Sequence, residues 1–155
     1  VYFLDWYDKN QCHHGNEAGH DRSNGRIFKL VYNDTKTIRV DLRQKTDEEL
    51  VQLQLHKNDW HVRHARRLLQ EPGPNPKVHT ALEQLLAAQA DPTRRVRALW
   101  ALHATGGLTE KLALQTLRDP NEYVRAWAIQ LLCEEKKASP EALAQFAVCG
   151  GDVLW

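Results

Sequence analysis

Hydrophobic and polar positions follow two different periods along the chain, and the change falls near residue 45. Residues 1–42 contain short runs rich in aromatic and β-branched residues, which is the pattern of β-strands. From residue 46 onward, apolar residues recur every three or four positions, which is the period of an amphipathic helix. The sequence therefore predicts a mainly α protein with a short β-rich segment at its N-terminus.

The β-rich segment, residues 1–45, contains three candidate strands. They are VYFLDWY at 1–7, RIFKLVY at 26–32 and KTIRVDL at 36–42. Three strands as short as these do not form a stable sheet unless they pack on something else. We therefore expect Tyr2, Trp6 and Phe28 to pack on the first helices, or the open strand edges to pair with another chain.

Helices are predicted throughout residues 46–149, and their starts carry recognisable capping signals. Thr46 with Glu49 three residues later is a capping box. Asp91 and Asp119 are each followed by Pro, so that Asp accepts from free N–H groups and Pro needs no acceptor. The predicted helices cover residues 46–55, 57–70, 77–89, 91–104, 108–117, 119–134 and 139–148.

These helices repeat a common pattern. The segments NDWHVRHARRLL, DPTRRVRALWAL and DPNEYVRAWAIQLL share a polar cap, then Val-Arg, then a face of Ala, Leu and Trp. A helix pair of this kind cannot bury its apolar stripe alone and must stack on its neighbour. We therefore predict three helix pairs, the start of a fourth at Ser139, and buried side chains for Val62, Val96 and Val124.

Arginine and tryptophan recur in the second helix of each pair. The equivalent arginines are Arg63, Arg97 and Arg125, each directly after a predicted buried valine. We expect each of them to bond to the Asp or to a main-chain carbonyl of the adjacent repeat, with a basic ladder for a ligand as the alternative. The tryptophans Trp60, Trp100 and Trp127 are predicted to pack between repeats.

The run Asp-x-x-x-x-Val-Arg is found at Asp91–Arg97 and Asp119–Arg125. It resembles the opening of the second helix in HEAT repeats. The resemblance implies a HEAT-like α-α superhelix over residues 46–149, whereas the tail GGDVLW at 150–155 fits no repeat.

A wider resemblance spans both halves of the chain. The order DWYD, CHH, DRSNGRIFKL, ELVQLQLHKNDWHVRHARRLLQE, ALWALHATGGL and DPNEYVRAWAIQLLCE is similar to the large membrane-bound dehydrogenases of planctomycete-type bacteria. In that family a β-propeller precedes HEAT-like helices. The resemblance implies that residues 1–45 end a propeller and that the chain is a piece of a longer periplasmic or exported redox protein. Its partner would be another protein or the missing propeller domain, and dehydrogenase activity would need that propeller.

Potential metal ligands are concentrated in the stretch DWYDKNQCHHGNEAGHDRSNGR, residues 5–26. Cys12, His14, His20 and Asp21 could hold a divalent metal, which would favour a metal-dependent hydrolase. Their spacing matches no established zinc pattern. We therefore predict a polar loop with no catalytic role and no cofactor, with the metallohydrolase as the alternative.

Charge and hydropathy limit the kinds of partner. The net charge of +1 gives no general basic surface, and no apolar run approaches the roughly 18 residues that a membrane span needs. Basic residues do gather on the helices, where phosphate contacts to nucleic acid are conceivable, but acidic residues are spread through the same half. We therefore expect an interaction scaffold with a protein partner rather than nucleic acid. The candidate interaction residues are Arg63, Arg66, Arg67, Arg94 and Arg95.

Overall fold

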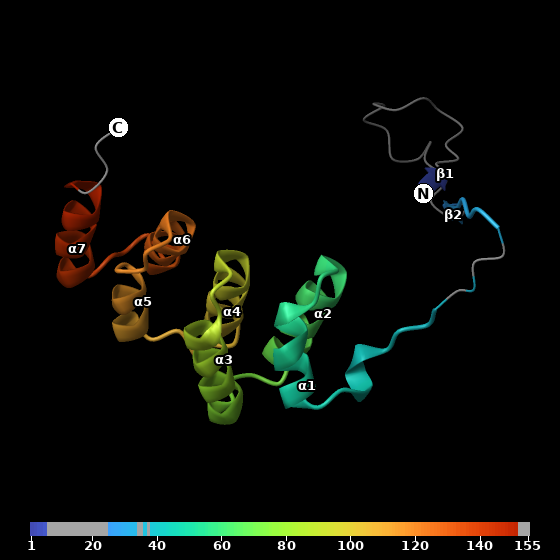
Figure 1. Ribbon diagram of the computed structural model, residues 1–155, viewed down its shortest axis with the longest axis horizontal. Helices are drawn as coiled ribbons and strands as arrows, with labels where there is room; N and C mark the ends of the chain where they lie inside the picture. Colours follow the sequence, from blue (N-terminus) through green and yellow to red (C-terminus); the bar gives the residue numbers. More distant parts are fainter. Residues whose placement is uncertain (6–24, 34–35, 37, 152–155) are drawn as a thin grey trace, which may run out of the picture. The chain divides into compact units, whose positions relative to one another are not determined.

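The structure, a computed structural model, describes residues 1–5, 25–33, 36 and 38–151. Within these residues the chain is mainly helical and has one two-stranded sheet (Figure 1). It divides into two compact units, Val1–Val40 and Asp41–Trp155, and each is described here by itself. The predicted fold class, a mainly α protein with a short β-rich N-terminal segment, is confirmed at this level.

The N-terminal unit contains a small antiparallel sheet. Strand β1 (Tyr2–Asp5) pairs with β2 (Arg26–Lys29). Phe3 lies opposite Phe28, and their rings stack with centroids 5.1 Å apart. Two of the three predicted strands therefore form within the described residues, and the second is shorter than predicted. The covering of their aromatic side chains by the helices or by another chain stays a prediction.

The third predicted strand, at 36–42, is wrong for the described residues. Residues 38–41 have no regular structure, and Leu42–Gln44 form a 3-10 turn, η2. The carboxylate of Asp41 accepts a hydrogen bond from the backbone N–H of Arg43 at 3.1 Å. This local bond starts a helical turn in place of an extended strand, which the alternation of apolar and polar residues did not reveal.

The C-terminal unit contains the α-helices of the described residues. They are α1 (Asp47–Gln52), α2 (Asp59–Gln70), α3 (Pro76–Ala88), α4 (Pro92–Ala104), α5 (Glu110–Thr116), α6 (Glu122–Leu132) and α7 (Pro140–Gly151). A 3-10 turn, η3 (Leu53–Leu55), extends α1. Each predicted helix is present, with its ends displaced by a few residues.

Most helices begin where the capping signals predict. Thr46 and Glu49 form the reciprocal capping box at the start of α1. The carboxylate of Asp91 accepts from two N–H groups in the first turn of α4. The hydroxyl of Ser139 accepts from the N–H of Ala142 at 3.0 Å, which caps α7. These starts depend only on neighbours in sequence, so the sequence predicts them well.

The predicted cap of α6 by Asp119 is wrong. Asn121 is the N-cap, and its side chain accepts from the N–H of Tyr123 at 3.0 Å. Asp119 is buried instead, where its carboxylate accepts from the N–H of Asn121 and pairs with the guanidinium of Arg95 on α4. The ion pair to another helix therefore moves the start of α6 beyond Asp119.

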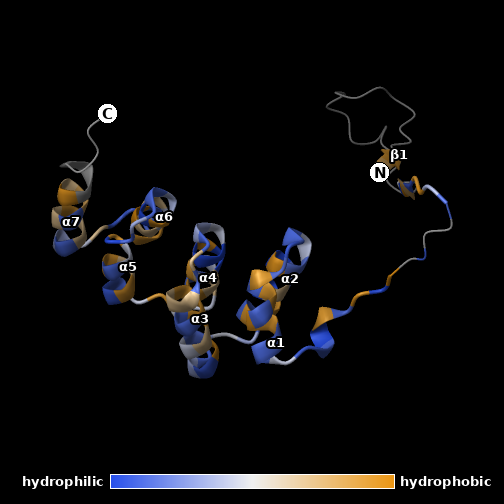
Figure 2. Ribbon diagram, in the orientation of Figure 1, coloured by the Kyte–Doolittle hydropathy of each residue, from blue (hydrophilic) through white to orange (hydrophobic). Residues whose placement is uncertain are grey.

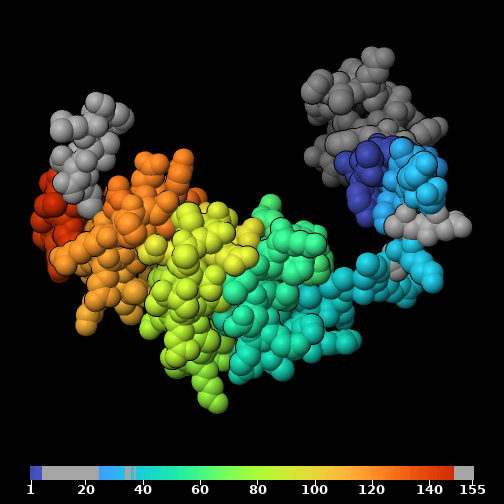
Figure 3. All heavy atoms as spheres, in the orientation of Figure 1, coloured from blue at the N-terminus to red at the C-terminus, as the bar shows by residue number. Residues whose placement is uncertain are grey.

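Helices pack in the order in which they follow one another. α1 packs on α2, α3 on α4 and α5 on α6, while the second helices α2, α4 and α6 contact one another in turn. In the space-filling view, side chains of α1–α2 and α3–α4 meet along a continuous boundary (Figure 3). Val62, Val96 and Val124 are all buried, with at most 6% of each exposed. The predicted burial of these three valines is therefore confirmed.

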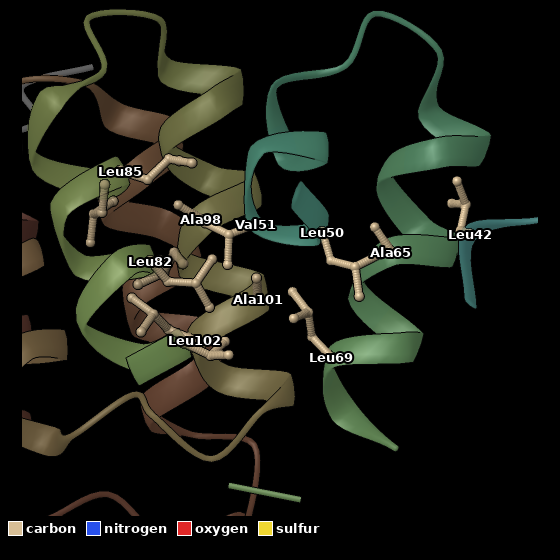
Figure 4. Packing of buried hydrophobic residues seen from close by; sticks show 13 residues of the cluster. Leu42, Leu50, Val51, Ala65, Leu69, Leu82, Leu85, Ala98, Ala101 and Leu102 are labelled. Atoms are coloured by element: carbon tan, nitrogen blue, oxygen red, sulfur yellow. The ribbon is translucent and has the colours of Figure 1, made fainter. Parts of the chain in front are cut away.

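Two hydrophobic clusters stabilise this unit. In the larger one, Leu50 and Leu69 face each other between α1 and α2, while Leu82 and Leu102 lie between α3 and α4 (Figure 4). The smaller cluster joins α5, α6 and α7, and contains Leu114, Leu117, Ala128 and Ala142. Hydropathy colouring shows apolar and polar residues mixed along α2 to α6, as expected of amphipathic helices (Figure 2). None of the helices in the described part of the chain is long and apolar enough to span a membrane.

Val96→Asp is expected to unfold the helical unit. Val96 is 6% exposed on α4, and an unpaired carboxylate there would be desolvated at a cost of several kcal/mol. Val148→Asp on α7 is the matched control, because Val148 is 67% exposed. Circular dichroism during thermal denaturation should show loss of helix for Val96→Asp alone. A cooperative transition at the wild-type temperature would contradict the repeat alignment.

Candidate interaction surface

The predicted metal ligands Cys12, His14, His20 and Asp21 lie outside the described residues. Among the residues that are described, no three His, Cys, Asp or Glu side chains converge as a metal site. The metal-binding alternative for the stretch 5–26 therefore stays a prediction from sequence. The candidate functional side chains among the described residues lie on the helices.

Trp60 is exposed on α2, so its predicted packing between repeats is wrong. Half of the side chain is exposed, and its ring stacks on His64 with centroids 5.0 Å apart. At 100° per residue, Trp60 and His64 lie on the side of α2 opposite the buried Val62, Ala65 and Leu69. The repeat alignment predicted only that each second helix carries a tryptophan, and not which side of the helix it occupies.

An open pocket surrounds this tryptophan. Its volume is about 390 Å³, and Arg63 and Arg67 flank the stacked Trp60–His64 pair. Asp59 pairs with Arg63 at 2.9 Å, and Glu71 lies 3.2 Å from Arg67. The α2 surface, defined as Trp60, Arg63, His64 and Arg67, thus combines an exposed aromatic ring with guanidinium groups that already have carboxylate neighbours.

Histidines also crowd the start of α2. His56 and His61 lie with ring centroids 4.2 Å apart, and the edge of His61 meets Trp60. Nδ1 of His56 accepts from the backbone N–H of Asn58 at 3.0 Å, which fixes this ring. Desolvation lowers the pKa of His61, and the neighbouring His56 and His64 lower it further. His61 therefore contributes less positive charge to this region than a fully solvated histidine would.

Asp59 links α2 to α4. Its Oδ1 accepts from Nη2 of Arg97 at 3.0 Å, and its Oδ2 accepts from Nε of Arg63 at 2.9 Å. Nη1 of Arg97 also donates to the carbonyl of His56 at 3.0 Å. The hydrogen bond from Arg63 lowers the pKa of Asp59, and the charges of Arg97 and Arg66 add to this effect. Arg97 thus has the predicted role between repeats, whereas Arg63 bonds within its own helix.

The third equivalent arginine, Arg125, also differs from the prediction. Its Nη1 donates to the carbonyls of Asp119 at 2.8 Å and Pro120 at 3.1 Å, both just before its own helix. The connection between α4 and the α6 region is made instead by the ion pair of Arg95 with the buried Asp119. Arg95, predicted as an interaction residue, therefore has a structural role.

Arg66 lies on the side of α2 that faces α4. Its guanidinium is 5.1 Å from the centroid of the Trp100 ring, and the ring of Trp127 meets Trp100 edge-on at 4.6 Å. Trp100 and Trp127 are partly buried, as predicted for packing between repeats. Desolvation lowers the pKa of Arg66. Nε of Arg66 and Nε1 of Trp100 are buried without a hydrogen-bond partner. These three residues are called the Arg66 cluster.

The five arginines predicted as an interaction surface thus separate into three groups. Arg63, Arg67 and Arg94 are exposed and lie near carboxylates of their own helix or its cap. Arg95 is held by Asp119, and the guanidinium of Arg66 lies over an indole ring. Their role in binding stays a prediction, and the sequence did not indicate the partners that distinguish them.

A second pocket, which the sequence did not predict, lies beside α4, α5 and α6. Its volume is about 620 Å³, and His103 and Glu110 are among its lining residues. Nε2 of His103 lies 2.5 Å from a carboxylate oxygen of Glu134. His103 and Glu134 are far apart in sequence and belong to different repeats, so no local pattern could have indicated this contact.

Comparison of the chain with protein-family models, curated proteins and solved structures gave no significant match. The case for a function therefore comes from the geometry of the described residues.

Asp59→Asn is expected to destabilise the helical unit in a pH-dependent way. The pKa of Asp59 is lowered from 3.8 in the folded state, so its stabilisation is complete above pH 3.8 and is lost as pH falls through the lower folded-state pKa. Because half of this side chain is exposed, we expect a loss of about 1 kcal/mol at pH 6. Urea denaturation between pH 2 and pH 6 should show the two proteins converging in acid.

Arg97→Gln supplies the control for this prediction. In an Arg97→Gln background, Asp59→Asn should cost less than it does in the wild type, since the two side chains are coupled. Equal costs in both backgrounds, or a difference that persists at the lowest pH, would contradict the assigned ion pair.

Proposed function

We propose that the helical unit is a protein-interaction scaffold and that the α2 surface is its binding site. The observation that carries the proposal is the position of Trp60, a large aromatic side chain that is half exposed on a helix whose opposite face is buried. Tryptophan and arginine are enriched among the residues that contribute most to binding at protein interfaces. The α2 surface has both, around an open pocket.

The stacking of Trp60 on His64 supports this role. The two rings lie nearly parallel, with an interplanar angle of 16°. A ring held in this way loses little side-chain freedom when a partner covers it, which favours affinity. Trp60 is thus presented to a partner in an ordered position.

The packing of the helices supports an extended binding face. The second helices α2, α4 and α6 are neighbours, and repeat proteins use such rows of equivalent helices to bind elongated partners. We propose that the pairs form a HEAT-like α-α superhelix, with the α2 surface on its row of second helices.

Paired charges favour protein over nucleic acid as the partner. A phosphate backbone is bound by several cations that are free to neutralise it. On the helices described here, Arg63, Arg67 and Arg94 each have a carboxylate nearby, at 2.9, 3.2 and 3.9 Å. The surface is therefore better suited to a partner with mixed charges and apolar side chains.

Trp60→Ala is expected to weaken binding of peptides selected on the full 155-residue chain by at least about tenfold, a typical loss for a central interface tryptophan. Peptides would be selected from a displayed library of random 16-residue sequences, and their affinities measured by fluorescence polarisation. Tyr123→Ala is the matched control, because Tyr123 is also an exposed aromatic residue on a second helix, 66% exposed on α6.

Two results would count against the proposal. One is a selection that enriches no sequence above background on the wild-type chain. The other is a set of enriched peptides whose affinity is the same for the wild type and for Trp60→Ala, since such peptides would bind elsewhere.

A further inference from the structure

We infer that the Arg66 cluster is a binding site for a carboxylate, supplied by an aspartate or glutamate side chain of the protein that docks on this unit. The inference rests on the proposed scaffold function and names the chemistry of its partner. It concerns the side of α2 that faces α4, which differs from the α2 surface around Trp60.

Arg66 is the first part of the argument, because it has no anionic partner among the described residues. Its guanidinium lies over the Trp100 ring, 5.1 Å from the ring centroid. The neighbouring arginines all have a carboxylate within 4 Å, and these are Arg63, Arg67, Arg94, Arg95 and Arg97. Arg66 is thus a partly buried cation whose charge is not balanced by an ion pair of its own.

The carboxylate of Asp59 is not available to form an ion pair with Arg66. Asp59 acts on Arg66 electrostatically, but its two oxygens already accept from Arg63 and Arg97. Three guanidinium groups therefore gather around one carboxylate at the contact of α2 with α4. An additional carboxylate at this place would reduce the excess of positive charge.

The same cluster also contains hydrogen-bond donors that have no acceptor. Nε of Arg66 and Nε1 of Trp100 are both buried, and neither has an acceptor. Buried donors without acceptors are rare in folded proteins and are costly to leave unpaired. Because these two atoms are buried, a carboxylate of a docking protein would bind the other N–H groups of the same guanidinium, which are not among the buried atoms.

The position of the Arg66 guanidinium over the Trp100 ring suits a carboxylate in particular. A guanidinium that lies over an aromatic ring uses its face for the ring and leaves its edge for hydrogen bonds. That edge presents two parallel N–H groups, which match the two oxygens of a carboxylate. Trp100 is itself fixed by the edge-on contact with Trp127, so the site is ordered before a partner arrives.

The test follows the side-chain N–H signals of Arg66 and Trp100 by NMR in the ¹⁵N-labelled full chain. The probes are a short acetylated and amidated peptide with two aspartates beside a leucine, and its analogue with two asparagines. Both signals should shift saturably with the aspartate peptide, with a Kd in the range of about 1–10 mM. The asparagine peptide should bind at least about tenfold more weakly, because it lacks the charge.

Variants assign the effect to Arg66. Arg66→Gln should abolish the shift of the Trp100 indole signal, and Arg66→Lys should restore part of it, since lysine keeps the charge but not the planar edge. Arg118→Gln is the matched control, because Arg118 is an exposed arginine outside both the α2 surface and the Arg66 cluster, and it should leave the shift unchanged. The comparison of the two peptides on the wild-type chain needs no variant, so it holds even if Arg66→Gln alters the fold.

Several outcomes would overturn the inference. These are signals that do not move up to about 20 mM peptide, equal shifts with both peptides, or a stronger response to a single-stranded oligonucleotide at the same salt concentration, which would favour a phosphate ligand. If Arg66→Gln binds the aspartate peptide as the wild type does while Trp60→Ala still weakens the selected peptides, the carboxylate site fails and the scaffold stands. The reverse pattern would remove the α2 surface and leave the carboxylate site.

Discussion

The structure of the helical unit depends on one constraint, which is that α4 cannot be left uncovered. Val96, Leu99 and Leu102 are buried on it, and so are Ala98 and Ala101, so apolar residues lie around most of its circumference. A helix that is apolar on nearly every side must be enclosed by others. α3 covers one side of α4, and α2 and α6 cover the flanks. The order of the stack follows from the need to enclose this one helix.

Arginines on α4 then fix how its neighbours are placed. Arg97 bonds back to Asp59 and to the carbonyl of His56, whereas Arg95 bonds forward to the buried Asp119. Apolar contacts alone would allow one helix to slide along another, since they have no preferred direction. Bonds with defined geometry at both flanks of α4 select one register.

Local features of the helices could be predicted from the sequence, because they depend on residues close together in the chain. The capping box at Thr46 and the cap at Asp91 are of this kind. The burial of the repeated valines, of which Val96 is one, was also predictable, because a period of three to four residues marks the inner side of a helix. The strand predicted at 36–42 failed because alternation alone does not exclude an irregular segment.

The candidate site was less predictable for the same reason. Trp60 and Arg66 lie in a helix that the sequence placed correctly, yet their roles, and that of Asp119, depend on which other helices they contact. The Trp60 ring is half exposed and stacks on His64 of its own helix, the Arg66 guanidinium lies over the Trp100 indole, and Asp119 pairs with Arg95. Repeats with similar sequences do not specify these differences, because the neighbour of each repeat is different.

The division of the core into two clusters has a consequence for motion. The buried residues of the larger cluster lie on η2 and on α1 to α4, with side chains of α5 and α6 packed against them, while the smaller cluster joins α5, α6 and α7 and contains four buried apolar side chains of the described residues. Regions with fewer buried contacts open more often, as separate cooperative units. A partner bound on α2 would therefore slow amide exchange in the larger cluster more than in α7, whose buried residue Ala142 belongs to the smaller cluster.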